Sequence, residues 1–174
     1  MLTDNMEKAL NKQINKELFS AYLYFAMAAD LEDKGFAGTA HWMESQAQEE
    51  ISHAMRIYNF INERGGRAVL DAIEKPKKEW NSLKEIFEEA LEHEQKITAS
   101  INALMDIAVK ENDYATKSFL NWFVDEQVEE EDSVNEILDK INLIEDSRNG
   151  LYNLDKELQQ RPLMCQFVPE GEEE

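Results

Sequence analysis

The sequence is poor in the residues that break helices and in the one that cross-links chains. Its 174 residues include only six glycines, three prolines and one cysteine, Cys165. A single cysteine cannot form a disulfide within the chain. The scarcity of glycine and proline, together with an abundance of alanine, glutamate, lysine and leucine, favours a chain built from helices alone.

Positive charge and long apolar runs are also scarce. Eighteen lysines and arginines face 37 aspartates and glutamates, which gives a formal net charge of −19 at pH 7. Nucleic acids and anionic lipids are bound chiefly through Lys and Arg, so we expect no nucleic-acid partner and no membrane partner. No stretch approaches the ~20 apolar residues that cross a bilayer, and the opening MLTDNMEKAL lacks the apolar run of a signal peptide. We therefore expect a cytoplasmic protein.

Apolar residues recur at alternating spacings of three and four along most of the chain, which indicates amphipathic helices. Gly35 and the pair Gly65-Gly66 are typical helix ends, and Ser82 with Glu85 three residues later is a capping-box signature. The sequence predicts one domain, residues 1–174, with helices at about 4–34, 39–64, 82–110, 114–144 and 147–160 and a tail at 161–174.

The lengths of the connections predict the topology. Short connections make helices one and two antiparallel neighbours, and likewise helices three and four. The segment from about residue 65 to 81 could reach roughly 50 Å at about 3.3 Å per residue. A helix of about 26 residues is only roughly 39 Å long. The expected fold is therefore an all-α four-helix bundle with one long crossover between helices two and three, plus a short fifth helix.

Each long helix carries a polar interruption in its apolar stripe, near the middle of the helix. The interrupting residues are Glu17, Glu50, Glu94 and, on helix four, Gln127 and Glu130. Central positions lie at the same height in a bundle whichever way each helix runs. The four carboxylates are therefore expected to converge on one layer of the core.

Several buried carboxylates need compensation, because burying even one ionised carboxylate costs at least several kcal/mol. No Lys or Arg occupies the stripe positions, whereas two divalent metal ions would offset four negative charges. His53 follows Glu50 by three residues, shares its helix face and adds a nitrogen ligand. Carboxylates with one imidazole suit iron or manganese, with zinc also possible. The stretch QEEISHA, residues 48–54, is thus predicted to carry ligands of a two-metal site.

Three segments, MEKALNKQINKELFSAYLYFAMA, QAQEEISHA and FLNWFVDEQVEEED, resemble the non-haem ferritins of bacteria and archaea. The resemblance spans almost the whole chain and implies a ferritin-like bundle. One Glu-x-x-His motif is complete, Glu50 to His53. Helix four carries Gln127-x-x-Glu130 where bacterioferritins and rubrerythrins have a second Glu-x-x-His, which makes those two classes less compatible with the sequence.

The resemblance also implies a set of site residues. Glu17, Glu50, His53 and Glu94 would form a ferroxidase centre for two irons per subunit, with Glu50 and Glu94 touching both irons. Glu130 or Gln127 would complete the second iron. A third, looser iron site would involve Glu49, Glu126 and Glu129, for which a solvated acidic face is the alternative.

Roles can also be predicted for one tyrosine, one tryptophan and two histidines near these positions. Tyr24 resembles the catalytic tyrosine near the centre of ferritins, the alternative being a packed core aromatic. Trp122 is expected to pack, and His41 and His93 are expected at the surface.

The function implied by the resemblance is iron storage. Two ferrous ions would be oxidised by O2 or H2O2, and the ferric product would be stored as mineral inside a homo-oligomeric shell of 24 subunits. One alternative is a di-iron peroxide or oxygen reductase on the same bundle, although such proteins often carry a rubredoxin-like Cys-x-x-Cys module and this chain has only Cys165. The other is an acidic helical interaction protein without metal, in which replacing Glu50 by Gln would stabilise the fold and change no activity.

Overall fold

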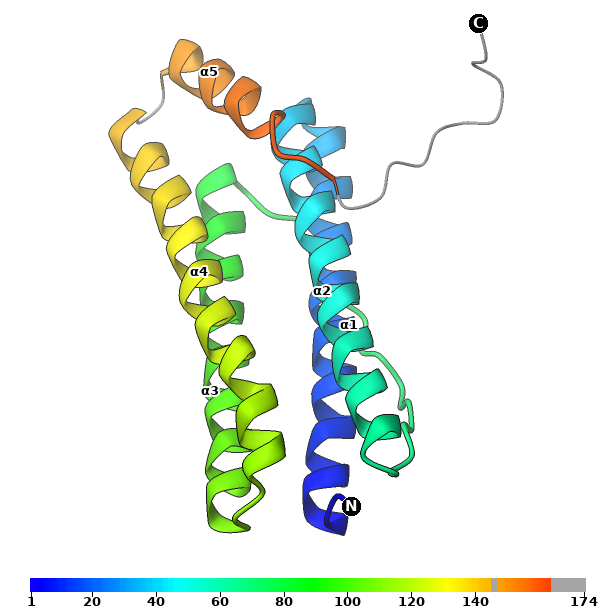
Figure 1. Ribbon diagram of the computed structural model, residues 1–174. Helices are drawn as coiled ribbons and strands as arrows, with labels where there is room; N and C mark the ends of the chain where they lie inside the picture. The colour runs from blue at the N-terminus through cyan, green and yellow to red at the C-terminus, as the bar shows by residue number, and fades with distance from the viewer. Residues whose placement is uncertain (145–146, 164–174) are drawn as a thin grey trace, which may run out of the picture.

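Four long helices, packed as two antiparallel pairs, form the protein (Figure 1). The structure is a computed structural model that describes residues 1–144 and 147–163; the predicted tail from residue 164 on, with Cys165, lies outside the described residues. The helices are α1 (Asp4–Asp33), α2 (Ala37–Glu63), α3 (Leu83–Lys110), α4 (Tyr114–Ile144) and α5 (Arg148–Leu158). The described residues contain no strand, which confirms the all-α prediction. None of the helices in this part of the chain is long and apolar enough to cross a membrane.

The helix ends follow from local hydrogen bonding. Ser82 begins α3 as predicted, because its Oγ accepts a hydrogen bond from the backbone N–H of Glu85 at 3.1 Å. The Glu85 carboxylate, however, accepts from the backbone N–H of Asn81 at 2.7 Å, one residue before the expected partner. Gly35 and Gly65 end α1 and α2 with positive φ angles of 82° and 74°, which a glycine adopts without steric cost.

The crossover between α2 and α3 runs along α1 and returns the chain to the opposite end of the bundle (Figure 1). Two asparagines one turn apart on α1 hold it. Asn11 donates to the carbonyl of Arg67 at 3.0 Å and accepts from the N–H of Val69 at 2.7 Å. Asn15 donates to the carbonyl of Ala72 at 2.9 Å. As a result α3 runs parallel to α2, as the connection lengths predict.

The apolar core is divided into two clusters with a polar layer between them. One cluster fills the end of the bundle near α5 and includes Tyr24, Met43, Phe87 and Val134. The other fills the opposite end; its members on the four long helices include Ile14, Ala54, Ile97 and Phe123. On every long helix the chain passes from one cluster to the other through the position where the sequence places a glutamate. The polar layer is therefore a continuous cross-section of the fold.

The short helix α5 is fixed to the start of α2 by one carboxylate. Asp155 Oδ1 accepts hydrogen bonds from the backbone N–H of Thr39 at 2.8 Å and from its Oγ1 at 3.0 Å. The two backbones approach closely at Gly38, where an added Cβ would lie 1.8 Å from the Asp155 carbonyl oxygen. Asp155 thus caps α2, which lacks a side-chain cap of its own at Phe36.

Replacing Gly38 by alanine should therefore displace α5. We expect the variant to lose about 1–3 kcal/mol of stability, the usual cost of overpacking a tight contact. Thermal unfolding of the purified variant measures the loss. Ala37→Ser, which adds one atom at the neighbouring exposed position, should leave the unfolding temperature near that of wild type. An unchanged unfolding temperature for Gly38→Ala would show that α5 does not dock as described.

Candidate metal centre

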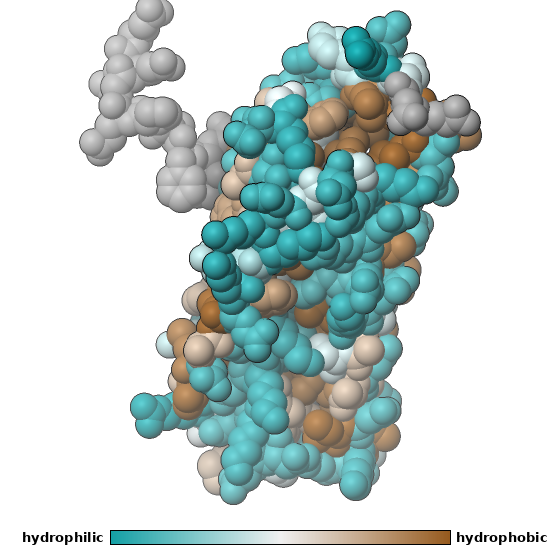
Figure 2. All heavy atoms as spheres, turned by 180° about the vertical axis from the view of Figure 1, so that it is seen from behind, coloured by the Kyte–Doolittle hydropathy of each residue, from teal (hydrophilic) through white to brown (hydrophobic). Residues whose placement is uncertain are grey.

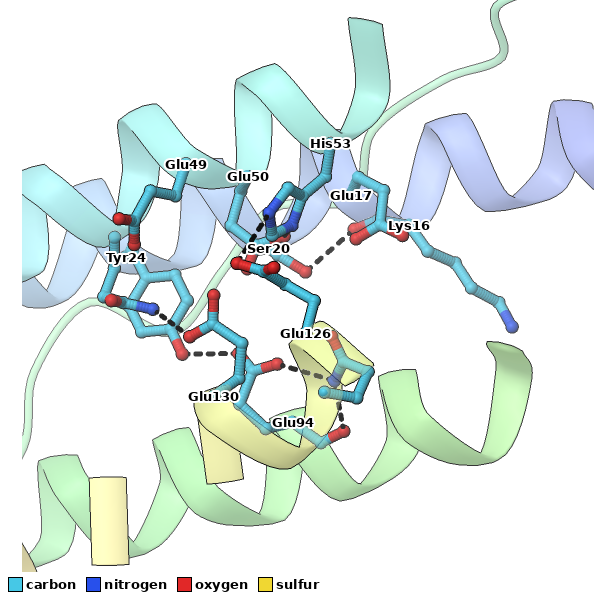
Figure 3. A network of polar contacts seen from close by, with 12 residues as sticks. Lys16, Glu17, Ser20, Tyr24, Glu49, Glu50, His53, Glu94, Glu126 and Glu130 are labelled. Atoms are coloured by element: carbon cyan, nitrogen blue, oxygen red, sulfur yellow. Dashed lines mark hydrogen bonds and ion pairs between the residues drawn. The ribbon is translucent and has the colours of Figure 1, made fainter. Parts of the chain in front are cut away.

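The polar layer brings together the carboxylates that interrupt the four stripes. Glu17 of α1, Glu50 of α2, Glu94 of α3 and Glu130 of α4 are all at most 4% exposed. Figure 3 shows their carboxyl groups turned toward one another and toward the His53 ring. Glu17, Glu50 and His53 each place a potential ligand atom within 4.8 Å of the others. The convergence predicted from the central positions is therefore present in the structure.

The innermost carboxylate oxygens have no N–H or hydroxyl donor. Within the described residues, this holds for both oxygens of Glu50 and for Oε2 of Glu17, all of them buried. The two side chains contact each other, so a protonated Glu50 donates to Glu17 when no cation is bound (Figure 3). The other oxygen of Glu17, Oε1, accepts from Gln13 Nε2 at 2.8 Å. The nearest nitrogen of His53 lies 3.7 Å from Glu50 Oε2, beyond hydrogen-bonding distance. Buried carboxylate oxygens without donors are what a site for cations would leave open.

The carboxylate of Glu94 has donors on both oxygens. The Tyr24 hydroxyl donates to Oε1 at 2.5 Å, and Gln127 Nε2 lies 3.2 Å from Oε2. Tyr24 is fully buried and belongs to the apolar cluster as well, so the packing role and the contact with the centre coexist. Gln127 turns its amide nitrogen, not a ligand oxygen, toward Glu94.

Burial and mutual repulsion favour the neutral form of these carboxyl groups when no cation is bound. Burial, followed by repulsion from Glu94, raises the pKa of Glu17 to about 7 and that of Glu130 to about 8. The same two causes raise the pKa of Glu50 well above its ordinary value. Burial, with a smaller contribution from the charge of Arg56, lowers the pKa of His53 to about 4. His53 is therefore neutral near pH 7, the form that binds metals.

The donor set fits two hard divalent cations such as ferrous iron. Carboxylate oxygens with a single neutral imidazole are the ligands that iron and manganese prefer. Metal ions would replace the protons that the raised pKa values imply, and their charge would offset the four carboxylates. The oxygens of Glu50, which have no N–H or hydroxyl donor within the described part of the chain, could face both ions.

The three acidic residues expected at a looser third site have different surroundings. Glu126 Oε1 lies 3.9 Å from His53 Nε2, and Glu126, His53 and Glu130 form a second group whose ligand atoms lie within 4.8 Å of one another. Glu49 is engaged by Arg161, whose Nη2 donates to Oε2 at 2.5 Å. Glu129 is exposed to solvent on α4. The structure thus gathers Glu126 with the centre, whereas Glu49 is ion-paired and Glu129 lies outside.

The expectation that His93 and His41 lie at the surface is wrong. His93 is partly buried between α3 and α1, where its Nε2 lies 2.7 Å from Ser20 Oγ, and burial lowers its pKa to about 4. His41 is half-buried, with Nε2 2.7 Å from the carbonyl oxygen of Arg161. His93 lies at a contact between two helices and His41 at a contact with the segment after α5, and a single-helix stripe reveals neither. Trp122 packs as expected, edge-on to the His53 ring at 5.4 Å.

Two buried glutamines and one arginine at the centre were not anticipated from the sequence. Gln13 contacts Glu17, Gln46 Nε2 donates to Glu130 Oε2 at 2.6 Å, and Arg161 pairs with Glu49. The two glutamines had a recognisable signal, because each stands one turn before a stripe glutamate, at positions i−4 of Glu17 and Glu50. Arg161 had none, since its place depends on how α5 docks.

The fold and the site together define a four-helix bundle with a buried carboxylate and histidine centre suited to two metal ions. A family described as the ferritin-like domain matches residues 7–144. The chain belongs to the ferritin family.

The chain is similar in sequence to named proteins over nearly its full length. The chain is 46% identical to a bacterial non-haem ferritin of Staphylococcus saprophyticus over 161 residues, covering 92% of this chain and 96% of that one. It is 43% identical over 158 residues to a probable bacterial non-haem ferritin-like protein of Haemophilus influenzae, covering 91% and 96%. An open-pore ferritin from Archaeoglobus fulgidus superimposes with a TM-score of 0.92 at 46% identity, covering 93% and 100%. The prediction of a ferritin-like bundle with a short fifth helix is confirmed.

The raised pKa values predict an unusual dependence of stability on pH. His53 and His93 are neutral in the folded protein above pH 6.5, and in the unfolded chain they release their remaining protons over the next pH unit or so, a smaller contribution of opposite sign to that of the carboxyl groups. Folded Glu17 and Glu130, with pKa values of about 7 and 8, still hold protons there that the unfolded chain has released. The metal-free protein should therefore lose stability from pH 6.5 to 8, by about 1.4 kcal/mol per pH unit for each such proton.

Chemical denaturation in chelator across this pH range measures the slope. Glu50→Gln should make it shallower and raise the stability, whereas Glu136→Gln, at an exposed position of α4, should leave it unchanged. A metal-free protein that gains stability between pH 6.5 and 8 would contradict the proton distribution described.

Proposed function

We propose that this protein is a ferroxidase that oxidises ferrous iron for storage. One observation carries the proposal: a buried layer holds four carboxylates and one neutral histidine, whose innermost oxygens have no donor within the described residues. Membership of the ferritin family and the non-haem ferritin relatives support it. Iron is the substrate, and two ferrous ions per subunit would balance the charge of the layer.

The proposed ligands divide between the two ions. Glu17 and His53 would hold one, Glu94 and Glu130 the other, and Glu50 would stand between them. Gln127, which lies beside Glu94, would complete the coordination of the second ion. Carboxylate oxygens favour the ferric state, so the same ligands that collect the ferrous ions lower the cost of oxidising them.

The reaction balances without a further cofactor. Two ferrous ions give one electron each, and O2 with two protons becomes H2O2; alternatively H2O2 with two protons becomes two waters. Tyr24, hydrogen-bonded to Glu94 at the edge of the centre, is the proposed catalytic side chain beside the ions. The ferric product would then leave for mineral storage.

The surface supports assembly with further copies of the chain. Several large apolar side chains of α1, α2 and the crossover are exposed: Tyr22, Phe25, Ile51, Met55, Tyr58, Val69, Leu70 and Ile73. Apolar surface also breaks the polar covering on the face drawn in Figure 2. Such exposure is typical of surfaces that are covered by a partner. We propose a hollow shell of 24 subunits in the cytoplasm that holds the mineral.

A third iron position is proposed beside the centre, where Glu126 lies near His53 and Glu130. Glu49 and Glu129 would join it from either side. In the structure Glu49 is paired with Arg161, whose guanidinium also stacks over the Trp42 ring at 4.6 Å. A third ion would therefore have to compete with the Arg161 guanidinium for Glu49.

Replacing Glu50 by glutamine should abolish fast iron oxidation. The variant keeps the shape of the side chain but removes the charge that both ions share. Stopped-flow absorbance after adding two ferrous ions per subunit in air measures the reaction. Wild type should give a fast ferric signal that saturates near two irons per subunit, and the variant should fall by at least about 100-fold. Glu136→Gln serves as the matched control with normal kinetics.

Either of two results would overturn the proposed function. If wild type oxidises iron no faster than buffer does, the buried layer is not a ferroxidase centre. Fast oxidation by wild type that is unchanged in Glu50→Gln would show that the reaction does not take place at the buried layer.

Replacing Arg161 by glutamine should strengthen binding of a third ion. The Glu49 carboxylate would lose its competing cation, and a partly exposed ion pair is worth roughly 0.2–1 kcal/mol, so the gain should reach at most about fivefold. Calorimetric titration with Zn²⁺ resolves the third binding step. Arg148→Gln, an exposed cation at the start of α5, is the control. A weaker third step in Arg161→Gln would show that Arg161 supports the site instead of competing for it.

A further inference from the structure

Three glutamines are buried in the polar layer, and each donates an amide N–H to a different carboxylate. Gln13 contacts Glu17 at 2.8 Å, Gln46 contacts Glu130 at 2.6 Å, and Gln127 contacts Glu94 at 3.2 Å. Gln127 has a proposed place at the second ion. Gln13 and Gln46 have none, yet they are 2% and 0% exposed and make the two shorter contacts.

The amide of Gln13 is oriented from both sides. Ser100 of α3 lies across the helix contact. Its one hydroxyl hydrogen has two acceptors within reach, Gln13 Oε1 at 2.6 Å and the Ile97 carbonyl oxygen at 3.0 Å, and the shorter contact favours Gln13. With the amide oxygen accepting from Ser100, the amide nitrogen must face Glu17. Glu17 Oε1 is thereby occupied, and Oε2 is left as the oxygen without a donor among the described residues. The two hydrogen bonds, from Ser100 to Gln13 and from Gln13 to Glu17, thus determine which oxygen of Glu17 faces the centre.

Gln46 makes the equivalent contact between α2 and α4. The backbones of these two helices make no close approach in the described part of the chain, so side chains must bridge them. Gln46 reaches from α2 to Glu130 Oε2, while its own Oε1 is buried without a partner among the described residues. Burying an amide oxygen without a hydrogen bond costs free energy of folding. The hydrogen bond to Glu130 is the favourable contact that Gln46 makes in return.

We propose that Gln13 and Gln46 are positioning residues of the metal centre. Each holds one carboxylate oxygen, Gln13 that of Glu17 and Gln46 that of Glu130, so that the other oxygen of the same carboxylate is presented to a metal ion. The inference rests on the proposed function, because it concerns the same ions. A neutral amide suits this task. A Lys or Arg would repel the incoming cation, and a further carboxylate would compete for it.

Binding of Co²⁺ tests the proposal without any oxidation step. Co²⁺ is not oxidised under argon, and its visible absorption reports the number and arrangement of its ligands. We expect Gln13→Met, which keeps the length of the side chain but removes the donor, to weaken one of two binding steps by about 10- to 100-fold and to change the absorption of that ion. Gln46→Met should do the same to the other step. Gln95→Met, at an exposed position of α3, should bind as wild type does.

A double-mutant cycle separates positioning from general destabilisation. If Ser100 acts only through Gln13, Ser100→Ala should weaken the same step as Gln13→Met, and the double variant should be no weaker than Gln13→Met alone. Additive losses would overturn the relay. Should Gln13→Met fail to fold, Ser100→Ala alone still decides, because it must change the affinity and absorption of the first ion.

Failure of this inference is distinguishable from failure of the proposed function. Wild type that binds two Co²⁺ ions, with both glutamine variants unchanged in affinity and spectrum, would overturn the inference and leave the centre intact. Wild type that binds no Co²⁺ in the layer would overturn both.

Discussion

The structure depends on a layer of like charges placed where a bundle would ordinarily be apolar. Glu17, Glu50, Glu94 and Glu130 divide the core into two apolar clusters, and among the residues that the structure describes no Lys or Arg is buried with them. Without cations the layer must hold protons at carboxyl groups whose pKa values are raised to about 7 and 8. Burying charge at this cost makes sense if metal ions supply the compensation, since breaking or omitting a buried pair is expensive. The two apolar clusters at the ends of the bundle thus stabilise the fold, while the polar layer between them provides the site.

The rest of the fold fixes the layer in place. The crossover held by Asn11 and Asn15 makes α3 parallel to α2, and Glu94, near the middle of α3, lies at the height of Glu17 and Glu50. Neutral donors then orient three of the carboxylates without cancelling their charge: the Tyr24 hydroxyl for Glu94, and glutamine amides for Glu17 and Glu130. Donors outside the ligand set commonly change metal affinity 10- to 100-fold. A bundle that presented the same glutamates without these donors would leave the direction of each carboxylate to chance.

Much of this could be predicted from the sequence, and the exceptions share a cause. Period and caps predict the four long helices, and the length of the crossover predicts their order, because these are properties of one segment at a time. The central position of each stripe glutamate likewise predicts their convergence. The partially buried contact of His93 with Ser20, the pairing of Arg161 with Glu49 and the direction of the Gln46 amide depend on two elements meeting. Such contacts leave no period in either helix, which is why His93 was wrongly expected at the surface.

The central claim is that the buried layer holds two metal ions side by side. Crystals soaked anaerobically with ferrous iron, measured on both sides of the iron absorption edge, test it most directly. The account predicts two anomalous peaks within the layer, one against Glu17 and His53 and one against Glu94 and Glu130, with Glu50 between them. A layer without anomalous signal, with iron only on the acidic surface, would contradict the account.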